Sequence, residues 1–278
     1  MLFDTHLHVM DRTRLNYPWL PDVPDLDRDS LYEHYARDAH RCGISNVLHM
    51  EVDVAPDQIN AEIDYIKELA ARPGSLVRGA IAACRPEEDG FAAHLERCLA
   101  DPFIKGFRRV LHVAPDDTSE RPLFRDNIAR LANTRLTFDL CVFPHQFERI
   151  LALVDLNPDV RFILDHCANP PIKHGMSAVW HKGITEFARR PNITAKISGV
   201  IAYGDLETWS VQSLRPYVEH TIGSFGWDRV VWGSDWPVCT LAHGLTAWVA
   251  ATHALTAGCS ADERDALYQG NARRIWSV

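Results

Sequence analysis

The first apolar stretch of the chain, residues 2–8, carries two histidines separated by a single residue, His6 and His8. Side chains alternate between the two faces of a strand, so both imidazoles are predicted to project from the same side. Two imidazoles that converge on one point are suited to bind a metal ion or to exchange protons. A polar pair at the edge of a sheet would show the same spacing, so these residues do not establish a site by themselves.

A second stretch able to do chemistry lies far along the chain, at residues 230–237, where an apolar run ends in Asp235. A carboxylate at the end of a strand can act as a general base or as a metal ligand. The first and last strands of a sheet become neighbours when the sheet closes into a barrel. A closed barrel would therefore bring Asp235 to His6 and His8.

Short apolar runs and helical stretches alternate along the whole chain. Besides residues 2–8, strands are expected at 46–52, 77–84, 104–111, 136–142, 161–167, 193–200 and 230–235. Helices are expected at 30–42, 55–71, 89–100, 124–133, 145–156, 178–190 and 206–225, and from 244 onward. Eight such units predict a single α/β domain over residues 1–278, a (β/α)8 TIM barrel. An open doubly wound sheet is the alternative, but no glycine-rich nucleotide-binding motif follows any strand.

Composition narrows the classes of partner. The 278 residues are 46% hydrophobic, enough for a large core, and the net charge of −8 argues against nucleic acid or an anionic membrane surface. No apolar run approaches the roughly 18 residues of a spanning helix, and the first residues lack a signal-peptide pattern. Seven scattered cysteines without a C-x-x-C pair are typical of reduced thiols. We expect a cytoplasmic protein with a small-molecule partner, and a homo-oligomer is compatible with the sequence.

In a barrel of this type, chemistry belongs to the C-terminal ends of the strands. The reactive side chains expected there are His6, His8, Glu51, Cys84, Arg108, Arg109, His112, Cys141, His145, His166, Lys196, Ser198 and Asp235. Imidazoles on the first and sixth strands and a carboxylate on the eighth would combine metal binding with acid–base capacity.

Six short pieces of the chain resemble the amidohydrolase superfamily, each on its own strand and in the expected order. They are Asp4-Thr5-His6-Leu7-His8, Lys105-Gly106-Phe107-Arg108, Phe138-Asp139-Leu140, Asp165-His166, Lys196-Ile197-Ser198-Gly199 and Gly233-Ser234-Asp235-Trp236-Pro237. Together they resemble the branch that hydrolyses lactones, including those of L-fuconate and L-rhamnonate and 2-pyrone-4,6-dicarboxylate. The resemblance implies an enzyme that opens a lactone ring, with a sugar-acid lactone as the expected substrate.

The resemblance also implies a role for each matching residue. Asp235 would be the general base that takes a proton from water. His6 and His8 would bind a metal or polarise the lactone carbonyl directly, and His166 would hold the water and later protonate the departing alkoxide. Arg108 would donate to the carbonyl oxygen or to a substrate carboxylate, because a planar guanidinium suits both.

One departure from better-known binuclear relatives bears on the metal. Those members carry a bridging lysine or glutamate at the end of the fourth strand and a metal-binding histidine at the fifth. Here the fourth strand ends in Arg108 and Arg109. His145 does follow the fifth strand, but at a position where the lactone-hydrolysing branch resembles one that tolerates different residues. We therefore expect one divalent ion, with zinc as the first choice, or none. Its ligands would come from His6, His8, His166 and Asp235.

Several of these residues also have structural interpretations. Arg108 could pair with Asp139, because a buried carboxylate needs a partner, and Lys196 could be such a partner too. Glu51 could accept a hydrogen bond from a ligating histidine.

The substrate is expected to contact aromatic side chains. Trp19, Tyr203 and Trp236 are candidates for the wall of a sugar-binding pocket. Large aromatic residues serve core packing more often than ligand contact, which is the alternative for all three.

Rival functions remain open at this stage. A metal-dependent decarboxylase of an aromatic or unsaturated acid has a similar first and eighth strand. A cysteine nucleophile is conceivable at Cys84 or Cys141, although no G-x-S-x-G elbow for a serine occurs. A barrel without activity that binds a sugar acid is the alternative outside enzymes.

Overall fold

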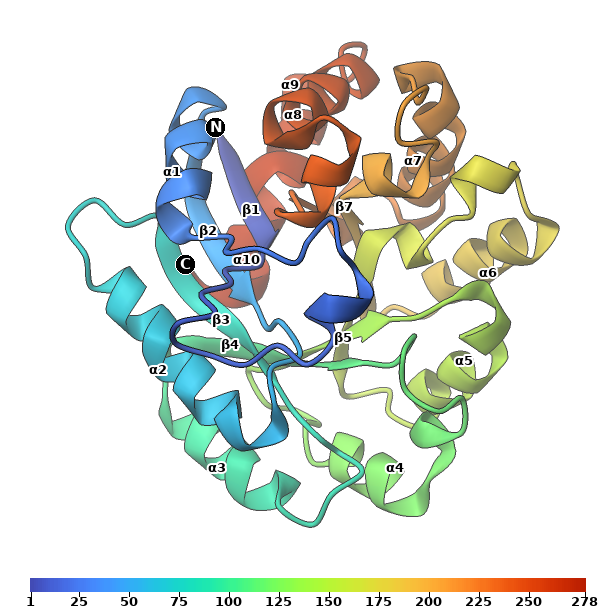
Figure 1. Ribbon diagram of the computed structural model, residues 1–278. Coiled ribbons are helices and arrows are strands. Elements are labelled where there is room, and N and C mark those ends of the chain that lie inside the picture. The colour runs from blue at the N-terminus through green and yellow to red at the C-terminus, as the bar shows by residue number, and fades with distance from the viewer.

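The computed structural model describes residues 1–278, which form one eight-stranded sheet in the order β1 to β8 (Figure 1). The strands are β1 (Leu2–Leu7), β2 (Ile44–Met50), β3 (Val77–Ala83), β4 (Ile104–Val110), β5 (Thr137–Cys141), β6 (Arg161–Leu164), β7 (Ile193–Ser198) and β8 (Val230–Gly233). Each strand pairs in parallel with the next. The strands are buried almost throughout, as expected for a parallel sheet covered by helices.

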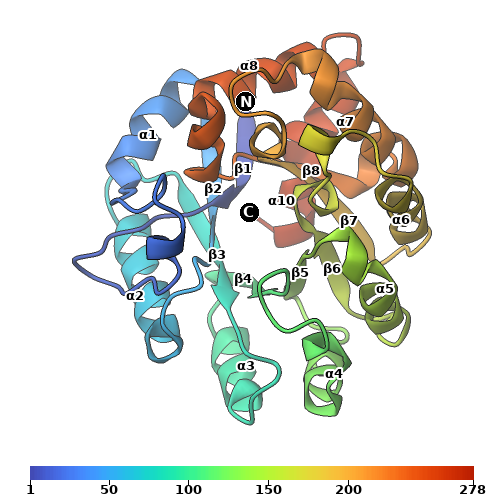
Figure 2. The same ribbon diagram turned by 45° about the vertical axis from the view of Figure 1, so that its right-hand side comes forward.

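The chain closes the sheet just beyond the ends of β1 and β8. The N–H of His8 donates to the carbonyl of Trp236 at 2.8 Å, and the N–H of Asp235 donates to the carbonyl of His6 at 2.9 Å. The buried carboxylate of Asp4 accepts from the N–H of Ser234 at 2.7 Å, which ties the two strands together lower down. The strands form a ring in Figure 2, so the predicted (β/α)8 barrel is confirmed.

Helices surround this ring (Figures 1 and 2). They are α1 (Tyr32–Arg41), α2 (Ile59–Ala70), α3 (Phe91–Ala100), α4 (Pro122–Ala129), α5 (Phe147–Asp155), α6 (Ala178–Ala188), α7 (Val211–Phe225), α8 (Gly244–Leu255), α9 (Ala261–Asp265) and α10 (Asn271–Trp276). The buried hydrophobic side chains of α1 to α8 join those of the strands in the larger hydrophobic cluster, whereas α9 buries none and α10 packs in a smaller cluster at one end of the barrel. No helix combines the length and the apolar character that a membrane span requires.

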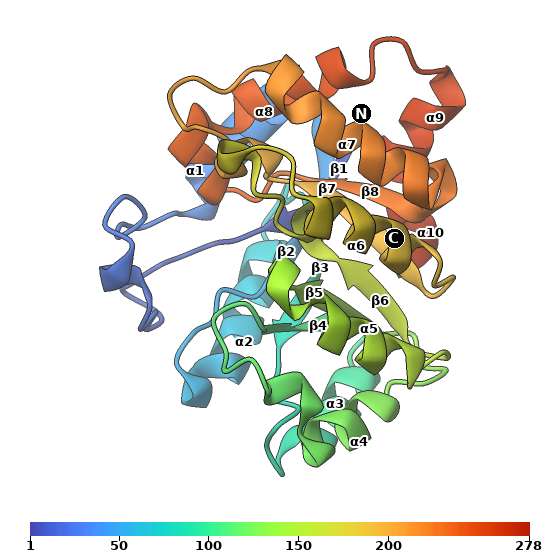
Figure 3. The same cartoon turned by 90° about the vertical axis from the view of Figure 1, so that its right-hand side faces the viewer.

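The two ends of the barrel are covered differently. At the N-terminal end of the strands, α10 places Trp276 in a small apolar cluster with strand residues such as Phe3, Ile81 and Val231. Figure 3 shows the long loop after β1 extending from the opposite end, away from α10. The C-terminal end of the barrel, on the side of this loop, is therefore the end available to a ligand.

All eight strands end one to three residues earlier than the sequence predicts, at this C-terminal end. The expected strand 161–167 stops at Leu164, and the expected strand 230–235 stops at Gly233. Four consecutive residues after β6, from His166 to Asn169, have φ between 48° and 57°, and Asp235 has φ of 56°. Left-handed backbone at residues other than glycine is strained, and such strain concentrates at functional sites.

Candidate active site

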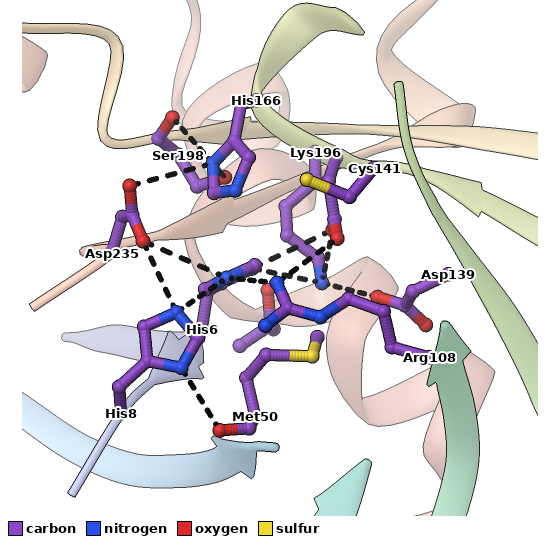
Figure 4. Close-up of polar contacts among 12 residues, drawn as sticks. His6, His8, Met50, Arg108, Asp139, Cys141, His166, Lys196, Ser198 and Asp235 are labelled. Carbon is purple, nitrogen blue, oxygen red and sulfur yellow. Dashed lines mark hydrogen bonds and ion pairs between the residues drawn. The ribbon is translucent and has the colours of Figure 1, made fainter. Parts of the chain in front are cut away.

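The predicted histidines and Asp235 meet at the C-terminal end of the barrel (Figure 4). The Nε2 atoms of His6 and His8 lie 3.2 Å apart. The Oδ1 atom of Asp235 lies 3.4 Å from His8 Nε2 and 3.7 Å from His6 Nε2. All three side chains are buried. One carboxylate oxygen and two imidazole nitrogens thus converge on one point.

Backbone contacts orient His8 toward this point. Its Nδ1 lies 3.0 Å from the carbonyl of Met50, and because a carbonyl only accepts, Nδ1 carries the hydrogen. The Nε2 lone pair is then free to face His6 and Asp235. Burial lowers the pKa of His8 and lowers that of His6 well below its ordinary value. Both imidazoles are therefore neutral near pH 7, the form that binds metals.

His166 is presented by the left-handed turn that follows β6. Its Nδ1 lies 2.9 Å from the hydroxyl of Ser198 and 3.7 Å from Oδ2 of Asp235. The indole N–H of Trp180 holds the turn by donating to the carbonyl of Cys167 at 2.8 Å. Burial opposes the charged form of His166, but the negative charge of Asp235 and a hydrogen bond with Cys141 outweigh it, so the pKa of His166 is raised.

Gly199 makes room for Asp235. A Cβ atom on this glycine would lie 2.4 Å from the Cβ of Asp235, and the glycine itself has φ of 56°. Both the close approach and the left-handed backbone exclude any other residue without a local shift. The Ser198-Gly199 pair at the end of β7 therefore positions two catalytic candidates, His166 and Asp235.

Asp165 belongs to the site although the sequence suggested no role for it. Its Oδ1 lies 2.9 Å from Lys196 Nζ and 3.5 Å from His6 Nδ1, and its Oδ2 lies 3.7 Å from Arg108 Nη1. Burial would raise the pKa of Asp165, but the charge of Lys196 and contact with His6 hold it well below the ordinary value. Asp165 thus stands behind His6, on the side away from Asp235. The only signal in the sequence was its place next to His166.

The two buried cations of the site, Lys196 and Arg108, have different carboxylate partners. Lys196 Nζ lies 2.5 Å from Asp139 Oδ2, so its predicted structural ion pair is confirmed. Arg108 does not pair with Asp139. Its Nε donates to Glu51 at 2.5 Å and its Nη2 to the carbonyl of Glu51 at 2.8 Å, while Nη1 lies 3.2 Å from His6 Nε2. Glu51 therefore supports Arg108 rather than a ligating histidine, because Lys196 already occupies Asp139.

A cavity of about 450 Å³ opens above these residues. Its lining includes Arg108, Trp19 and Tyr203, three of the predicted substrate contacts. Trp236 is not part of the lining. Its ring packs on Tyr35 with centroids 5.6 Å apart and its side chain belongs to the core. Asp235 faces the cavity and the next residue faces the opposite side, so Trp236 is a packing residue.

The remaining strand-end candidates divide between the cavity and its surroundings. Cys141 and His112 line the cavity and contact each other, with Sγ and Nδ1 3.1 Å apart. Cys84 is buried against the carbonyl of Arg108 and lies outside the lining. His145 is exposed and bonded to Asp116 at 3.1 Å, away from the convergence of His6 and His8. Nothing in this geometry brings His145 to a metal.

The donor set fits a divalent metal. A tetrahedral zinc ion with bonds of about 2.0–2.2 Å needs ligand atoms roughly 3.3–3.5 Å apart. The three separations among His6 Nε2, His8 Nε2 and Asp235 Oδ1 are 3.2, 3.4 and 3.7 Å. A second possible group, His6, Asp165 and His166, is compromised because Asp165 is already bonded to Lys196. The first group is therefore the better candidate, with His166 beside it.

Comparison with known proteins identifies the family of the chain. Residues 3–278 match the amidohydrolase family. Among curated proteins, the L-fucono-1,5-lactonase of Burkholderia ambifaria is 28% identical, over 99% of this chain and 95% of that protein. The match therefore spans the whole barrel, from β1, which carries His6, to the segment after β8 that carries Asp235.

Two solved structures show how widely the fold is shared. An amidohydrolase from Burkholderia multivorans, solved with bound zinc, superposes with a TM-score of 0.89 at 21% identity, covering 100% of this chain and 99% of that one. The 2,6-dihydroxybenzoate decarboxylase from Rhizobium gives 0.68 at 16% identity, covering 99% and 98%. At such identities the likeness concerns the fold alone. The family match over nearly every residue shows more: this chain belongs to the amidohydrolase family.

Proposed function

We propose that the protein hydrolyses a lactone, opening the ring to a hydroxy acid with Asp235 as the general base. The observation that carries this proposal is the convergence of the Asp235 carboxylate with two neutral imidazoles at the floor of a cavity. A carboxylate in this position can take a proton from a water molecule as that water attacks the acyl carbon. The relationship to a lactonase over the full chain supports the same reaction.

The neighbouring side chains supply the other requirements of ester cleavage. The Arg108 guanidinium lines the cavity and can donate to the carbonyl oxygen as negative charge develops on it. His166 Nδ1 lies 3.3 Å from the Ser198 carbonyl, so Nδ1 carries one hydrogen. Its raised pKa favours a second proton on Nε2, which is then available to the departing alkoxide. No covalent intermediate is needed.

A metal would strengthen this chemistry. A zinc ion held by His6, His8 and Asp235 would acidify water and polarise the lactone carbonyl. The neutral imidazoles and the spacing of the three donor atoms support this assignment, as does the zinc bound to a protein of the same fold. Asp165 would complete the arrangement by accepting from His6 Nδ1, so that the lone pair of Nε2, which Arg108 Nη1 approaches at 3.2 Å, would face the metal.

For the substrate, we propose a sugar-acid lactone, which places the enzyme in carbohydrate metabolism. The support is the relative named L-fucono-1,5-lactonase, because L-fucono-1,5-lactone is a lactone of this class. Decarboxylation of an aromatic acid is the second candidate, because a decarboxylase shares the fold. It has weaker support, since that likeness is one of fold alone.

The test measures the hydrolysis of a panel of aldonolactones through the acid that is released. The Asp235→Asn variant is assayed in parallel. We expect turnover by the wild type and a loss of roughly 10²- to 10⁴-fold in kcat for Asp235→Asn, with unchanged thermal unfolding. Asp262→Asn, an exposed carboxylate of α9, is the matched control and should keep full activity. Carbon dioxide release from aromatic acids without lactone turnover would establish the decarboxylase instead. Ligand-induced stabilisation without any turnover would indicate a binding protein.

A further inference from the structure

The cavity above the catalytic candidates has a polar floor and apolar walls. The floor consists of His8, Arg108, His166 and Asp235. Six hydrophobic residues, from the end of β4 and from the segments that follow β1, β2 and β8, form what we call the apolar sleeve: Met10, Trp19, Val23, Val52, Val110 and Val238. A ligand whose ring lies on the floor must therefore extend its substituents along hydrocarbon.

The polar groups near the sleeve are largely occupied within the protein. The indole N–H of Trp19 donates to the carbonyl of Val52 at 2.8 Å, so this residue offers only its apolar face. Asp53 is paired with Arg85 at 2.7 Å, and His112 Nδ1 contacts Cys141. Tyr203 and Asp22 also line the cavity, so a substrate that buries several hydroxyl groups here would replace only part of the hydrogen bonds it loses to water.

The charges of the cavity also disfavour an acidic substrate. Arg108 is the one lysine or arginine in the lining, and its charge is balanced by Glu51 at 2.5 Å and Asp165 at 3.7 Å. Asp22 also lines the cavity, and Asp235 is surrounded by the imidazoles of His6, His8 and His166. A carboxylate on the ring would therefore find no lysine or arginine in the lining that is not already paired.

From these walls we infer that the enzyme selects an uncharged lactone that carries a hydrocarbon substituent. The inference rests on the proposed lactone hydrolysis and narrows its substrate. Within the sugar-acid lactones proposed above it favours the least hydroxylated rings, and a plain alkyl lactone serves as the probe of the hydrocarbon contact. The volume of about 450 Å³ accommodates such a ring with a short chain. Val113, 65% exposed at the lining, continues the hydrocarbon surface toward solvent.

The direct test compares kcat/KM for three six-membered lactones: δ-octalactone, D-glucono-1,5-lactone and 2-pyrone-4,6-dicarboxylate. We expect δ-octalactone to be preferred over gluconolactone by roughly 10- to 200-fold, the range that hydrophobic contacts provide, and the dicarboxylate to be the poorest substrate. Preference for gluconolactone or for the dicarboxylate would overturn the inference while leaving lactone hydrolysis intact.

A binding measurement separates this inference from the proposed reaction. If no lactone is hydrolysed, thermal unfolding is followed with two cyclic ethers that cannot be hydrolysed, 2-propyltetrahydropyran and 1,5-anhydro-D-glucitol. Greater stabilisation by the propyl ether supports the apolar selection even though the proposed hydrolysis has failed. The apolar selection is rejected if the glucitol stabilises the protein more, or if neither ether stabilises it.

A variant of the sleeve tests the same contact in the enzyme. Val238 is half-buried, so Val238→Asn places an amide in the sleeve with little risk to folding. We expect kcat/KM for δ-octalactone to fall roughly 10-fold, mostly through KM, while that for gluconolactone falls less or rises. Val179→Asn, on the exposed face of α6, is the matched control and should change neither value. An equal loss on both substrates would contradict the inference.

Discussion

The two ends of this barrel use charged side chains in different ways, buried at one end and partly exposed at the other. At the C-terminal end, Lys196 lies between two buried carboxylates, Asp139 at 2.5 Å and Asp165 at 2.9 Å. At the N-terminal end, Arg135 and Arg161 donate to backbone carbonyls instead, Arg135 to Cys98 at 2.8 Å and Arg161 to Ile275 at 3.1 Å, and neither forms an ion pair. One end interlocks charges, whereas the other caps neutral carbonyl groups.

The difference matches the roles of the two ends, because the C-terminal end holds the candidate active site and the N-terminal end is closed by α10. Interlocked charges hold His6 between Asp165 on one side and Asp235 on the other, so the electrostatics of the site depend on every member. A backbone carbonyl that accepts a hydrogen bond from an arginine can bond to water or to another donor when that arginine is replaced. We therefore expect the same type of substitution to have large effects at the first end and small effects at the second.

The largest expected effect on stability comes from Lys196→Met. It leaves Asp139 and Asp165 buried without their cation, and we expect the free energy of unfolding to fall by about 3–5 kcal/mol, with loss of activity. Urea unfolding of Arg161→Met is the matched measurement at the other end, where about 1 kcal/mol is expected. Equal losses in the two variants would remove the contrast between the ends.

The apolar closure should affect stability without affecting chemistry. Trp276 is buried in the cluster under the barrel, and Trp276→Ala is expected to lower the free energy of unfolding by about 3 kcal/mol because it leaves a cavity. At a temperature where the variant is fully folded, kcat and KM should match the wild type. A large fall in kcat under those conditions would show that α10 contributes to the reaction.

Gly199→Ala should mainly affect the reaction, with an added loss of stability because alanine is strained at φ of 56°. Its new Cβ would displace Asp235, and a displacement of about 1 Å can lower kcat roughly 100-fold. Gly90→Ala is the control, since a Cβ there has no atom within 4 Å. Steady-state kinetics with thermal unfolding separates the two effects. Unchanged kcat in a folded Gly199→Ala variant would argue against close positioning of Asp235.

Zinc binding sharpens the assignment of the donor atoms. In protein stripped by a chelator, zinc at 100 times its dissociation constant should raise the free energy of unfolding by about 2.7 kcal/mol. His8→Ala should lose this stabilisation, and His145→Ala, which alters an exposed histidine, should keep it. Loss of the zinc effect in His145→Ala but not in His8→Ala would move the metal away from the proposed group.

The strand and helix pattern predicted the barrel because apolar periodicity depends on local sequence. It also placed His6, His8, His166 and Asp235 at one end, since parallel strands share a direction. The sequence did not show that Asp165 and His166 serve the same site. Adjacent strand residues face opposite sides, and only the left-handed turn after β6 lets both contribute.

The error at Trp236 has a different cause. Asp235 faces the cavity and adjacent strand residues face opposite sides, so the alternation itself assigns Trp236 to the core, where it packs beside Tyr35. Long-range pairing, in contrast, was hidden. Arg108 and Asp139 are register partners on neighbouring strands, yet Arg108 pairs with Glu51, the residue that follows β2, two strands away.

A single turnover in H₂¹⁸O, with enzyme in excess over a lactone substrate, tests the central claim most directly. If Asp235 acts as a base on water, the hydroxy acid from the first turnover carries one ¹⁸O atom in its carboxylate. Unlabelled product together with ¹⁸O in the side chain of Asp235 would show that this residue is a nucleophile. Failure of any lactone ring to open, with folded enzyme and zinc supplied, would contradict the proposed reaction itself.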